Sequence, residues 1–456
     1  MKKHHFILLC TALFILLFYG ETFVGVNLGI LGIAYSLLTF LDVYGTKRFT
    51  KMFVIFFITS VLSSVAFAWY GDFSSFLAVV FSLGLLTFKA KNKRIKPILL
   101  IPVFIINVFT FICRVFDFSD WLPKKRNAKW LQSIFVFVFI PGIFVMIFLG
   151  IYTLASQNFS DWFTQYELDI NIWELIILLV IGFVLAFNYR NFKIEKPIYK
   201  AHYLLDNNFS EEQKNIRPTY SFIDIDLERK GGVVTFILLN ILLLIFIITY
   251  NYEQFYEVSK SPSQLSQDTH ERVYAVIFSI IMAIFVIMFY FKSSFNFDNK
   301  AKTLKHLAYF WIILNGVLVL SAILKNTEYI SELGLTYKRL GVYGFLGLSI
   351  IGLVYTFFKI KNKRTNAYLF NVMFLYFYAT ILLCSFINWG NLATIYNINN
   401  HKGDYAFYKT FNFNEAILFE KYPNKDRFMT ENNIKSEQGK SFLSKKLYYY
   451  FINFEK

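Results

Sequence analysis

Charged and polar residues gather at the ends of four apolar segments in the second half of the chain. These segments cover residues 273–291, 304–324, 337–358 and 366–388. If all four cross a membrane, the approach to the first, the turn between the second and third, and the exit from the fourth share one face. The residues that this face collects are the strongest candidates for chemistry: His270, Glu271, Asn326, Glu328, Tyr329, Tyr337, Lys338, Arg339, Trp389 and Asn397.

Lys338 and Arg339 determine what that chemistry would be. They can pair with Glu271 or Glu328, or they can bind an anionic group such as a lipid phosphate. The planar guanidinium of Arg339 suits phosphate because it donates two parallel hydrogen bonds. The competing interpretation is a structural salt bridge, or long side chains that reach from a helix end to the membrane interface. If the two residues form a binding site, neutralising both removes function and leaves expression unchanged.

The signatures of other chemistries are absent from the sequence. There is no G-x-x-x-x-G-K-[ST], G-x-S-x-G or H-E-x-x-H string. The six histidines are scattered, and the three cysteines, Cys10, Cys113 and Cys384, lie in apolar stretches without C-x-x-C spacing. We therefore expect no metal site, no cofactor and no disulfide framework.

Three amides, Asn107, Asn240 and Asn315, are the main polar groups deep within apolar segments. We expect them to form hydrogen bonds between helices. A proton-coupled or ion-coupled transporter usually places a carboxylate or a histidine near the middle of the membrane. No carboxylate occupies such a position here, which argues against that class of protein.

Composition predicts an all-α, polytopic bundle of transmembrane helices. The 456 residues are 56% hydrophobic and 17% charged, whereas a soluble domain carries about 25% charged residues. A bilayer solvates such apolar side chains directly. The net charge of +16 comes mostly from lysine and arginine in short loops, where the positive-inside rule places them. We therefore expect no nucleic-acid partner.

Twelve apolar segments are candidates for spanning helices, which need about 17 to 25 mostly apolar residues. They are 5–20, 23–41, 51–69, 73–89, 97–113, 130–155, 172–190, 231–250, 273–291, 304–324, 337–358 and 366–388. We expect residues 1–390 to form the transmembrane domain, with a long polar loop at 191–230. Residues 391–456 are polar and are expected to form a small extramembrane region with helices near 414–422 and 441–451.

Loop charges orient these segments and leave one of them ambiguous. Lys2 and Lys3 place the N-terminus in the cytoplasm. Basic loops flank segment 97–113 on both sides, around Arg94 and Lys125. If this segment does not cross, both loops stay inside, eleven helices span the membrane, and the tail emerges on the outer face. If it crosses, there are twelve spans. We favour the non-crossing alternative, which predicts that a reporter fused near Lys125 reports cytoplasm.

Several strings in the second half resemble a known family. They include 228–232 (E-R-K-G-G), 307–312 (L-A-Y-F-W-I) and, as the most specific, 334–342 (G-L-T-Y-K-R-L-G-V), followed by Asn388-Trp389 and Tyr396-Asn397. They resemble the bacterial membrane families called domain of unknown function 4153 and domain of unknown function 4173. The resemblance implies a multi-pass protein of the bacterial plasma (inner) membrane and supplies no activity.

Three functions are compatible with this sequence. A non-enzymatic membrane or envelope-maintenance factor fits the lack of catalytic groups and is our leading hypothesis. A transporter or channel fits the number of spans but lacks a charge at the middle of the membrane. An intramembrane enzyme acting on lipid or an envelope polymer is supported only by the polar cluster on one face. The expected partners are the lipid bilayer and, as a candidate ligand, an anionic lipid or an envelope component.

Overall fold

A computed structural model describes residues 2–92, 94–122, 140–156, 171–215, 222–256, 262–423, 425 and 427–452, with positions 133, 136, 137 and 218. At 146, 154, 254–256, 262–272 and 427–430 it describes the backbone alone. Lys125 therefore lies outside the described residues. The described chain is helical apart from turns, loops and an isolated bridge between Asn208 and Arg364, which confirms the predicted all-α class.

Among the described residues, nine helices are long and apolar enough to cross a membrane. They are α2 (Val26–Val43), α3 (Lys51–Tyr70), α4 (Phe73–Lys91), α11 (Ile172–Asn191), α13 (Ile225–Tyr256), α14 (Pro262–Tyr290), α15 (Lys302–Leu333), α16 (Tyr337–Lys361) and α17 (Asn366–Phe386). The described residues contain three shorter apolar helical segments. Pro97–Phe109 is treated below, and the other two are α1 (Lys3–Phe18) and α9 (Ile140–Ala155). At 16 residues each, they measure about 24 Å, somewhat less than the hydrocarbon core of about 30 Å.

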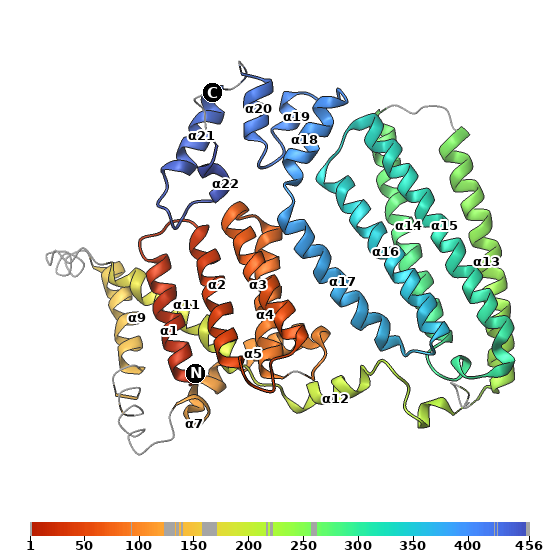
Figure 1. The fold of residues 1–456 in the computed structure, drawn as a ribbon, viewed down its shortest axis with the longest axis horizontal. Helices are drawn as coiled ribbons and strands as arrows, with labels where there is room; N and C mark the ends of the chain where they lie inside the picture. Colours follow the sequence, from red (N-terminus) through yellow and green to blue (C-terminus); the bar gives the residue numbers. More distant parts are fainter. Residues whose placement is uncertain are drawn as a thin grey trace.

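The helices form two bundles that are joined by α17 (Figure 1). In the first bundle, α1 packs against α2 and α11, and α3 packs between α2 and α4. The second bundle contains α13, α14, α15 and α16, with α15 in contact with the other three. Helix α17 contacts α3 and α4 on one side and α16 on the other, so it couples the two bundles.

Small residues allow close contact between α2 and α3. A Cβ added at Gly29 would lie 2.7 Å from the Cβ of Ala68 and 2.8 Å from the carbonyl oxygen of Ser64. The Oγ atoms of Ser36 and Ser60 are 2.5 Å apart across the same interface. Small residues and interhelical hydroxyl contacts are the usual means of helix association in a bilayer, where lipid removes the hydrophobic driving force.

The segment after α4 does not form a spanning helix. It comprises η1 (Pro97–Leu99), α5 (Leu100–Phe109), α6 (Phe111–Phe116) and α7 (Phe118–Trp121). Helix α5 has ten residues and measures about 15 Å, half of the hydrocarbon core. At the start of the segment, the ammonium of Lys96 lies 3.5 Å from the carboxylate of Asp206. At its end, the carboxylate of Asp120 lies 2.6 Å from the ammonium of Lys193. Both ends therefore lie at one face, as the non-crossing alternative requires.

That face is here called the basic face. It carries the first residues of α1, α3, α13, α15 and α17 and the last residues of α4, α11 and α16 (Figure 1). The predicted polar loop at 191–230 also lies here and contains α12 (Lys196–Leu204) and η3 (Glu212–Lys214). The loop contacts α17 through the Asn371 side-chain amide, which donates to the carbonyl of Leu205 at 3.0 Å.

Residues 389–452, here called the cap, lie at the opposite ends of the bundles and contact α2, α3 and the turn between α15 and α16 (Figure 1). Its helices are α18 (Trp389–Asn399), α19 (Tyr405–Tyr408), α20 (Glu415–Lys421), α21 (Arg427–Gly439) and α22 (Leu447–Tyr450). The helix expected near 414–422 corresponds to α20. Of the helix expected near 441–451, only the four residues of α22 are helical, and α21 was not predicted. We call these ends of the bundles the cap face.

Candidate functional site at the cap face

The turn between α15 and α16 contains the most specific string in the sequence, and its conformation explains its glycine. Gly334 has a φ of +83° and ends α15. A side chain is excluded there because an added Cβ would lie 2.6 Å from Oδ1 of Asn397. Thr336 then caps α16, because its hydroxyl accepts from the backbone N–H of Arg339 at 3.4 Å. The residues Gly334, Thr336 and Arg339 thus build a tight helix junction.

Asn397 of α18 holds this junction from the cap side. Its Oδ1 accepts from the N–H of Leu335 at 2.6 Å, and its Nδ2 donates to the carbonyl of Leu335 at 2.9 Å. Both residues are buried. Leu335 also packs with Ile330, Ala393 and Phe411. This small apolar core lies between the cap and the helical hairpin that α15 and α16 form. A predicted site residue therefore has a structural role as a tether.

Arg339 is also engaged within the junction. Its guanidinium donates to the carbonyl of Gly334 and lies over the ring of Tyr329, 4.0 Å from the ring centroid. Its own carbonyl accepts from the Asn326 side chain at 3.1 Å. Glu328, one of the expected acidic partners of Arg339, instead pairs with Lys325 at 3.1 Å. The arrangement holds α15 and α16 together at their cap-face ends.

The remaining predicted site residues are spread along the same face. Tyr337 accepts from the backbone N–H of Asn412 at 2.9 Å and thus contacts the cap. Trp389 donates from its indole N–H to the carbonyl of Cys384 at 3.0 Å, and Lys338 is exposed. His270 and Glu271 lie on α14, in the part where only the backbone is described. The structure therefore brings together Asn326, Tyr329, Arg339 and Asn397, with Tyr337 at the cap contact.

The cap is held to the first bundle as well. The backbone N–H groups of Val26 and Asn27 donate to the carbonyls of Lys445 and Leu443 at 3.0 and 2.9 Å. These are first-turn donors of α2, which have no partner within their own helix. A Cβ at Gly25 would collide with the carbonyl oxygen of Lys445, so only glycine permits this approach. No local sequence pattern predicts this contact between two distant segments.

A polar hollow of about 310 Å³ opens in the cap, between α20 and α21. Among the residues that line it are Glu415, Glu437 and Tyr449. Tyr449 donates to Oε1 of Glu415 at 3.0 Å, and Oε1 of Glu437 lies 2.5 Å from Lys440. The second carboxylate oxygen of each glutamate is buried and has no hydrogen-bond partner among the described residues. Burial raises the pKa of the Glu415 carboxyl.

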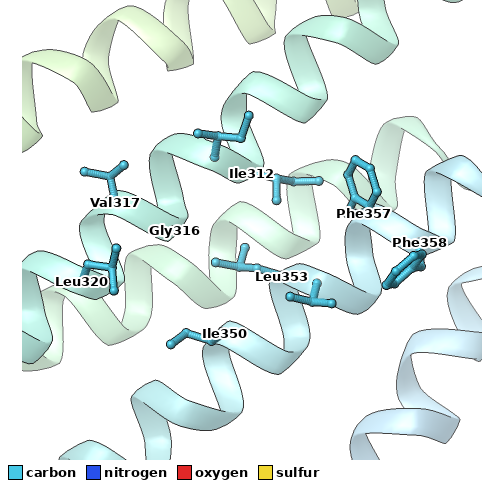
Figure 2. Close-up of a pocket in the computed structure, with 10 residues that line it drawn as sticks. Ile312, Gly316, Val317, Leu320, Ile350, Leu353, Phe357 and Phe358 are labelled. Carbon is cyan, nitrogen blue, oxygen red and sulfur yellow. The ribbon is translucent and has the colours of Figure 1, made fainter.

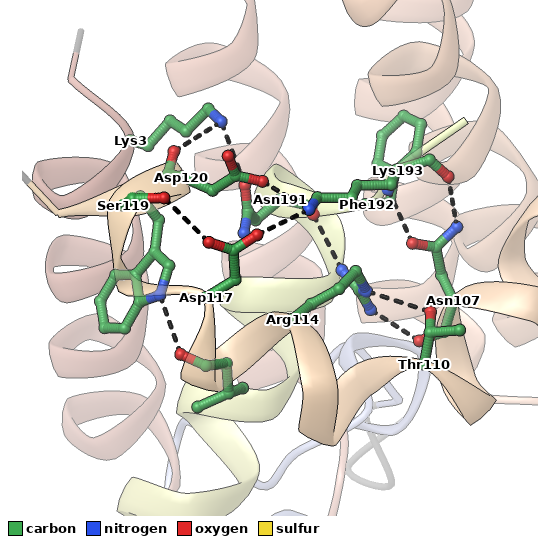
Figure 3. Close-up of polar contacts among 12 residues, drawn as sticks. Lys3, Asn107, Thr110, Arg114, Asp117, Ser119, Asp120, Asn191, Phe192 and Lys193 are labelled. Atoms are coloured by element: carbon green, nitrogen blue, oxygen red, sulfur yellow. Dashed lines mark hydrogen bonds and ion pairs between the residues drawn. The ribbon is translucent and has the colours of Figure 1, made fainter. Parts of the chain in front are cut away.

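The basic face has its own polar network, which anchors the non-crossing segment (Figure 3). Arg114 is buried and donates to the carbonyls of Asn191 and Asn107 at 2.8 and 2.6 Å. Asn107 pairs with both backbone groups of Lys193, each at 2.7 Å. The Lys193 ammonium in turn contacts Asp117 at 3.0 Å, which lowers the pKa of that carboxyl.

Many cations on the basic face bind backbone carbonyls. The helix macrodipole makes such carbonyls at helix ends favourable partners for positive charge. The buried Lys359 donates to the carbonyl of Phe291 at 2.7 Å. Phe291 follows directly after the end of α14. Further examples are Lys3 to Asp120, Arg48 to Ala90 and Lys305 to Asn296. These side chains gather at one face of the protein and also stabilise the fold.

The deep amides behave differently from one another. Asn240 donates to the carbonyl of Leu307 on a neighbouring helix at 3.1 Å, as expected. Asn107 lies at the basic face and bonds across to Lys193. Asn315 bonds within its own helix, to the carbonyl of Trp311 at 2.8 Å. In the part of the chain that the structure describes, no three His, Cys, Asp or Glu side chains come together as a metal site would require.

These features define a multi-pass, all-helical membrane protein with a folded cap on one face. The chain belongs to the family described as Domain of unknown function (DUF4153), whose model matches residues 51–413. The family resemblance predicted from the sequence is thus confirmed, and the match reaches further into the first half than the quoted strings. It includes the Gly334 junction and α18. No curated protein and no solved structure matches the chain.

Proposed function

We propose that this protein is a non-enzymatic envelope factor of the bacterial plasma membrane, and that its cap is the surface that binds an envelope partner. In this proposal eleven helices cross the membrane: the nine long ones together with α1 and α9. The N-terminus and the basic face are cytoplasmic, and the cap lies outside.

The charge distribution supports this orientation. The basic face carries Lys47 and Arg48 between α2 and α3 with Lys51 at the start of α3, and Arg364 between α16 and α17 with Lys361 at the end of α16. The connections at the cap face between α1 and α2 and between α3 and α4 contain Glu21 and Asp72 and no lysine or arginine. Lysine and arginine in short loops favour the cytoplasmic side.

The observation that carries the proposal is the double attachment of the cap. Asn397 ties it to Leu335 in the second bundle, and the carbonyls of Leu443 and Lys445 tie it to the start of α2 in the first. A segment held at both ends forms a rigid platform. Preorganised surfaces of this kind bind partners with little loss of conformational entropy.

The polar side chains at the junction support a binding role over an enzymatic one. Arg339 and Asn397 both direct their polar atoms at backbone groups of the hairpin. A catalytic group needs to reach the reacting atoms of a substrate. The hollow beside Glu415 and Glu437 is the polar concave feature of the cap and is where we place the partner.

A complementation experiment tests the proposal. Ser436 lines the hollow and is exposed, and Asn432 is an exposed residue of the same helix that does not line it. In a strain that lacks the protein, we expect an impermeant dye to enter the cells. Wild type and Asn432→Trp should restore the barrier, whereas Ser436→Trp should not, at equal protein levels in the membrane.

Four results would contradict the proposal. An intact barrier in the deletion strain, or full rescue by Ser436→Trp, would remove its basis. Solute flux in vesicles that contain the purified protein would favour a transporter or channel. Turnover of a lipid or of an envelope polymer by the purified protein would favour an enzyme.

A further inference from the structure

An apolar groove lies between α15 and α16, at the surface of the second bundle (Figure 2). Its volume is about 520 Å³. One wall consists of Ile312, Gly316 and Leu320, and the other of Ile350 and Phe357. Ile313 and Val354, which also line it, are 62% and 46% exposed, so the groove is open to the side.

Gly316 creates the depth of this groove. A Cβ added there would have no heavy atom within 4 Å. Glycine is therefore not required by helix packing at this position, in contrast to Gly29 between α2 and α3. The missing side chain leaves a channel between the two helices, and its lining is apolar throughout.

The groove has the length and position of one lipid chain. Ile312 to Leu320 spans eight residues, or about 12 Å of helix. One leaflet of the hydrocarbon core is about 15 Å thick. On α16 the groove runs toward the basic-face end, because Phe357 is four residues from the end of that helix. On α15 it lies at the middle of the helix, at Ile312–Leu320 of Lys302–Leu333. The α16 side of the groove therefore opens toward the leaflet on the basic side.

A cation stands at the basic-face end of the groove. The ammonium of Lys361 lies 5.9 Å from the ring centroid of Phe357, which lines the groove. Lys361 is exposed. On α15, Lys302 and His306 continue the exposed stripe of Ile313 and Leu320 toward the same end, at the spacing of one helix face.

We propose that this groove binds one acyl chain of an anionic phospholipid from the leaflet at the basic face, with Lys361 contacting its phosphate-bearing headgroup. The apolar walls take the chain, and the ammonium supplies the charge complementarity. This site is separate from the cap and does not depend on the envelope role proposed above.

A lipid competition experiment on the full-length protein in mild detergent tests this site. The protein is incubated with equal amounts of phosphatidylglycerol and phosphatidylcholine of the same chain composition and purified again. Retained lipid is then quantified by mass spectrometry. We expect wild type to retain phosphatidylglycerol over phosphatidylcholine by about fivefold, the ratio that corresponds to about 1 kcal/mol for one lysine at an anionic headgroup.

Two variants, each with a control, distinguish binding of the acyl chain from recognition of the headgroup. Gly316→Leu fills the groove and should abolish retention of both lipids, whereas Gly344→Leu, on an exposed part of α16 outside the groove, should behave as wild type. Lys361→Gln should retain lipid and lose the preference for phosphatidylglycerol. Lys338→Gln, an exposed lysine on the cap face, should keep it.

If Gly316→Leu does not purify as a monodisperse protein, Val354→Trp fills the same groove from α16. Equal retention in the filled-groove variant and in Gly344→Leu would overturn the proposal. So would a wild-type ratio near one, or an unchanged preference in Lys361→Gln.

Discussion

Asn397 and Leu335 are 62 positions apart, and the side-chain amide of the first pairs with both backbone groups of the second, at 2.6 and 2.9 Å. Asn107 pairs in the same way with Lys193 on the opposite face, at 2.7 Å for each bond. One asparagine thus fixes the cap to the hairpin, and another fixes the non-crossing segment to the end of α11. In both cases one buried side-chain amide satisfies the backbone N–H and the backbone carbonyl of a residue outside regular secondary structure.

Removing the Asn397 amide should release the cap from the second bundle. Asn397→Ala leaves the buried N–H and carbonyl of Leu335 without partners, at a cost of about 2–4 kcal/mol. We expect a lower melting temperature in detergent and faster proteolysis within the cap. Asn400→Ala, at an exposed position of the same turn, is the control. Equal melting temperatures for wild type and Asn397→Ala would show that the tether does not stabilise the fold.

Gly334→Ala should be destabilising for two independent reasons. The φ of +83° disfavours any side chain, and the added Cβ would approach Oδ1 of Asn397 to 2.6 Å. We expect a loss of about 1–3 kcal/mol. Gly341→Ala, seven residues later in α16 and with open space around its Cβ, should be neutral or slightly stabilising because alanine favours helix. A thermal unfolding series compares the two, and similar melting temperatures would contradict the assigned turn.

Substitutions of Arg339 and of Lys338 should differ in their effect on the amount of folded protein in the membrane. Arg339→Gln removes the bond to the Gly334 carbonyl and the contact with the Tyr329 ring, so we expect less folded protein in the membrane. Lys338→Gln changes an exposed side chain and should leave the protein level unchanged. Immunoblots of membrane fractions measure both. A normal level of Arg339→Gln combined with loss of function would instead support the binding site that the sequence suggested.

Glu415 should make the stability of the cap depend on pH. Burial raises the pKa of its carboxyl, so the folded state favours the protonated form. A carboxyl of this kind adds stability below its unfolded pKa and loses it as the pH rises through the folded pKa. Glu415→Gln keeps an acceptor for Tyr449 and removes the charge. We therefore expect its melting temperature to exceed that of wild type at neutral pH.

That difference should shrink as the pH falls toward about 4, the unfolded pKa of a glutamate. Glu420→Gln, an exposed carboxylate of the same helix, controls for the change in net charge. A difference between wild type and Glu415→Gln that stays constant over this pH range would show that burial does not perturb Glu415.

Much of the membrane architecture could be predicted from the sequence, because hydropathy and loop charge are direct consequences of the bilayer. The segments predicted at 51–69 and 73–89 correspond closely to α3 and α4. The charge around 97–113 favoured a non-crossing segment, which stays a prediction; the short helices η1, α5, α6 and α7 that the segment forms are compatible with it. Helix α15 extends nine residues past the predicted end at 324, because Asn326 bonds to the carbonyl of Arg339 and Ile330 packs against Ala393 and Phe411 of the cap, contacts that hydropathy does not mark.

The roles of the candidate site residues could not be predicted in the same way. Because consecutive spanning helices run in alternate directions, the sequence predicted Asn326, Arg339 and Asn397 on one face. The structure brings these residues together. Sequence alone could not reveal that Arg339 binds a carbonyl of its own turn, since that depends on the φ of Gly334. The contact of Lys445 with α2 joins segments more than 400 residues apart, as does the bond from Ser444 to Glu21, and neither segment carries a local signal of it.

The sidedness of Glu328 tests the outward placement of the cap face most directly. Cys10, Cys113 and Cys384 are replaced, a single cysteine is introduced at Glu328, and intact cells are treated with a membrane-impermeant thiol reagent. A cysteine at Lys200, which is exposed in α12 on the basic face, serves as the control. We expect position 328 to label in intact cells and position 200 to label only after lysis. Labelling of position 328 only after lysis, with the protein present in the membrane, would place the cap in the cytoplasm and contradict both the eleven-span arrangement and the envelope role.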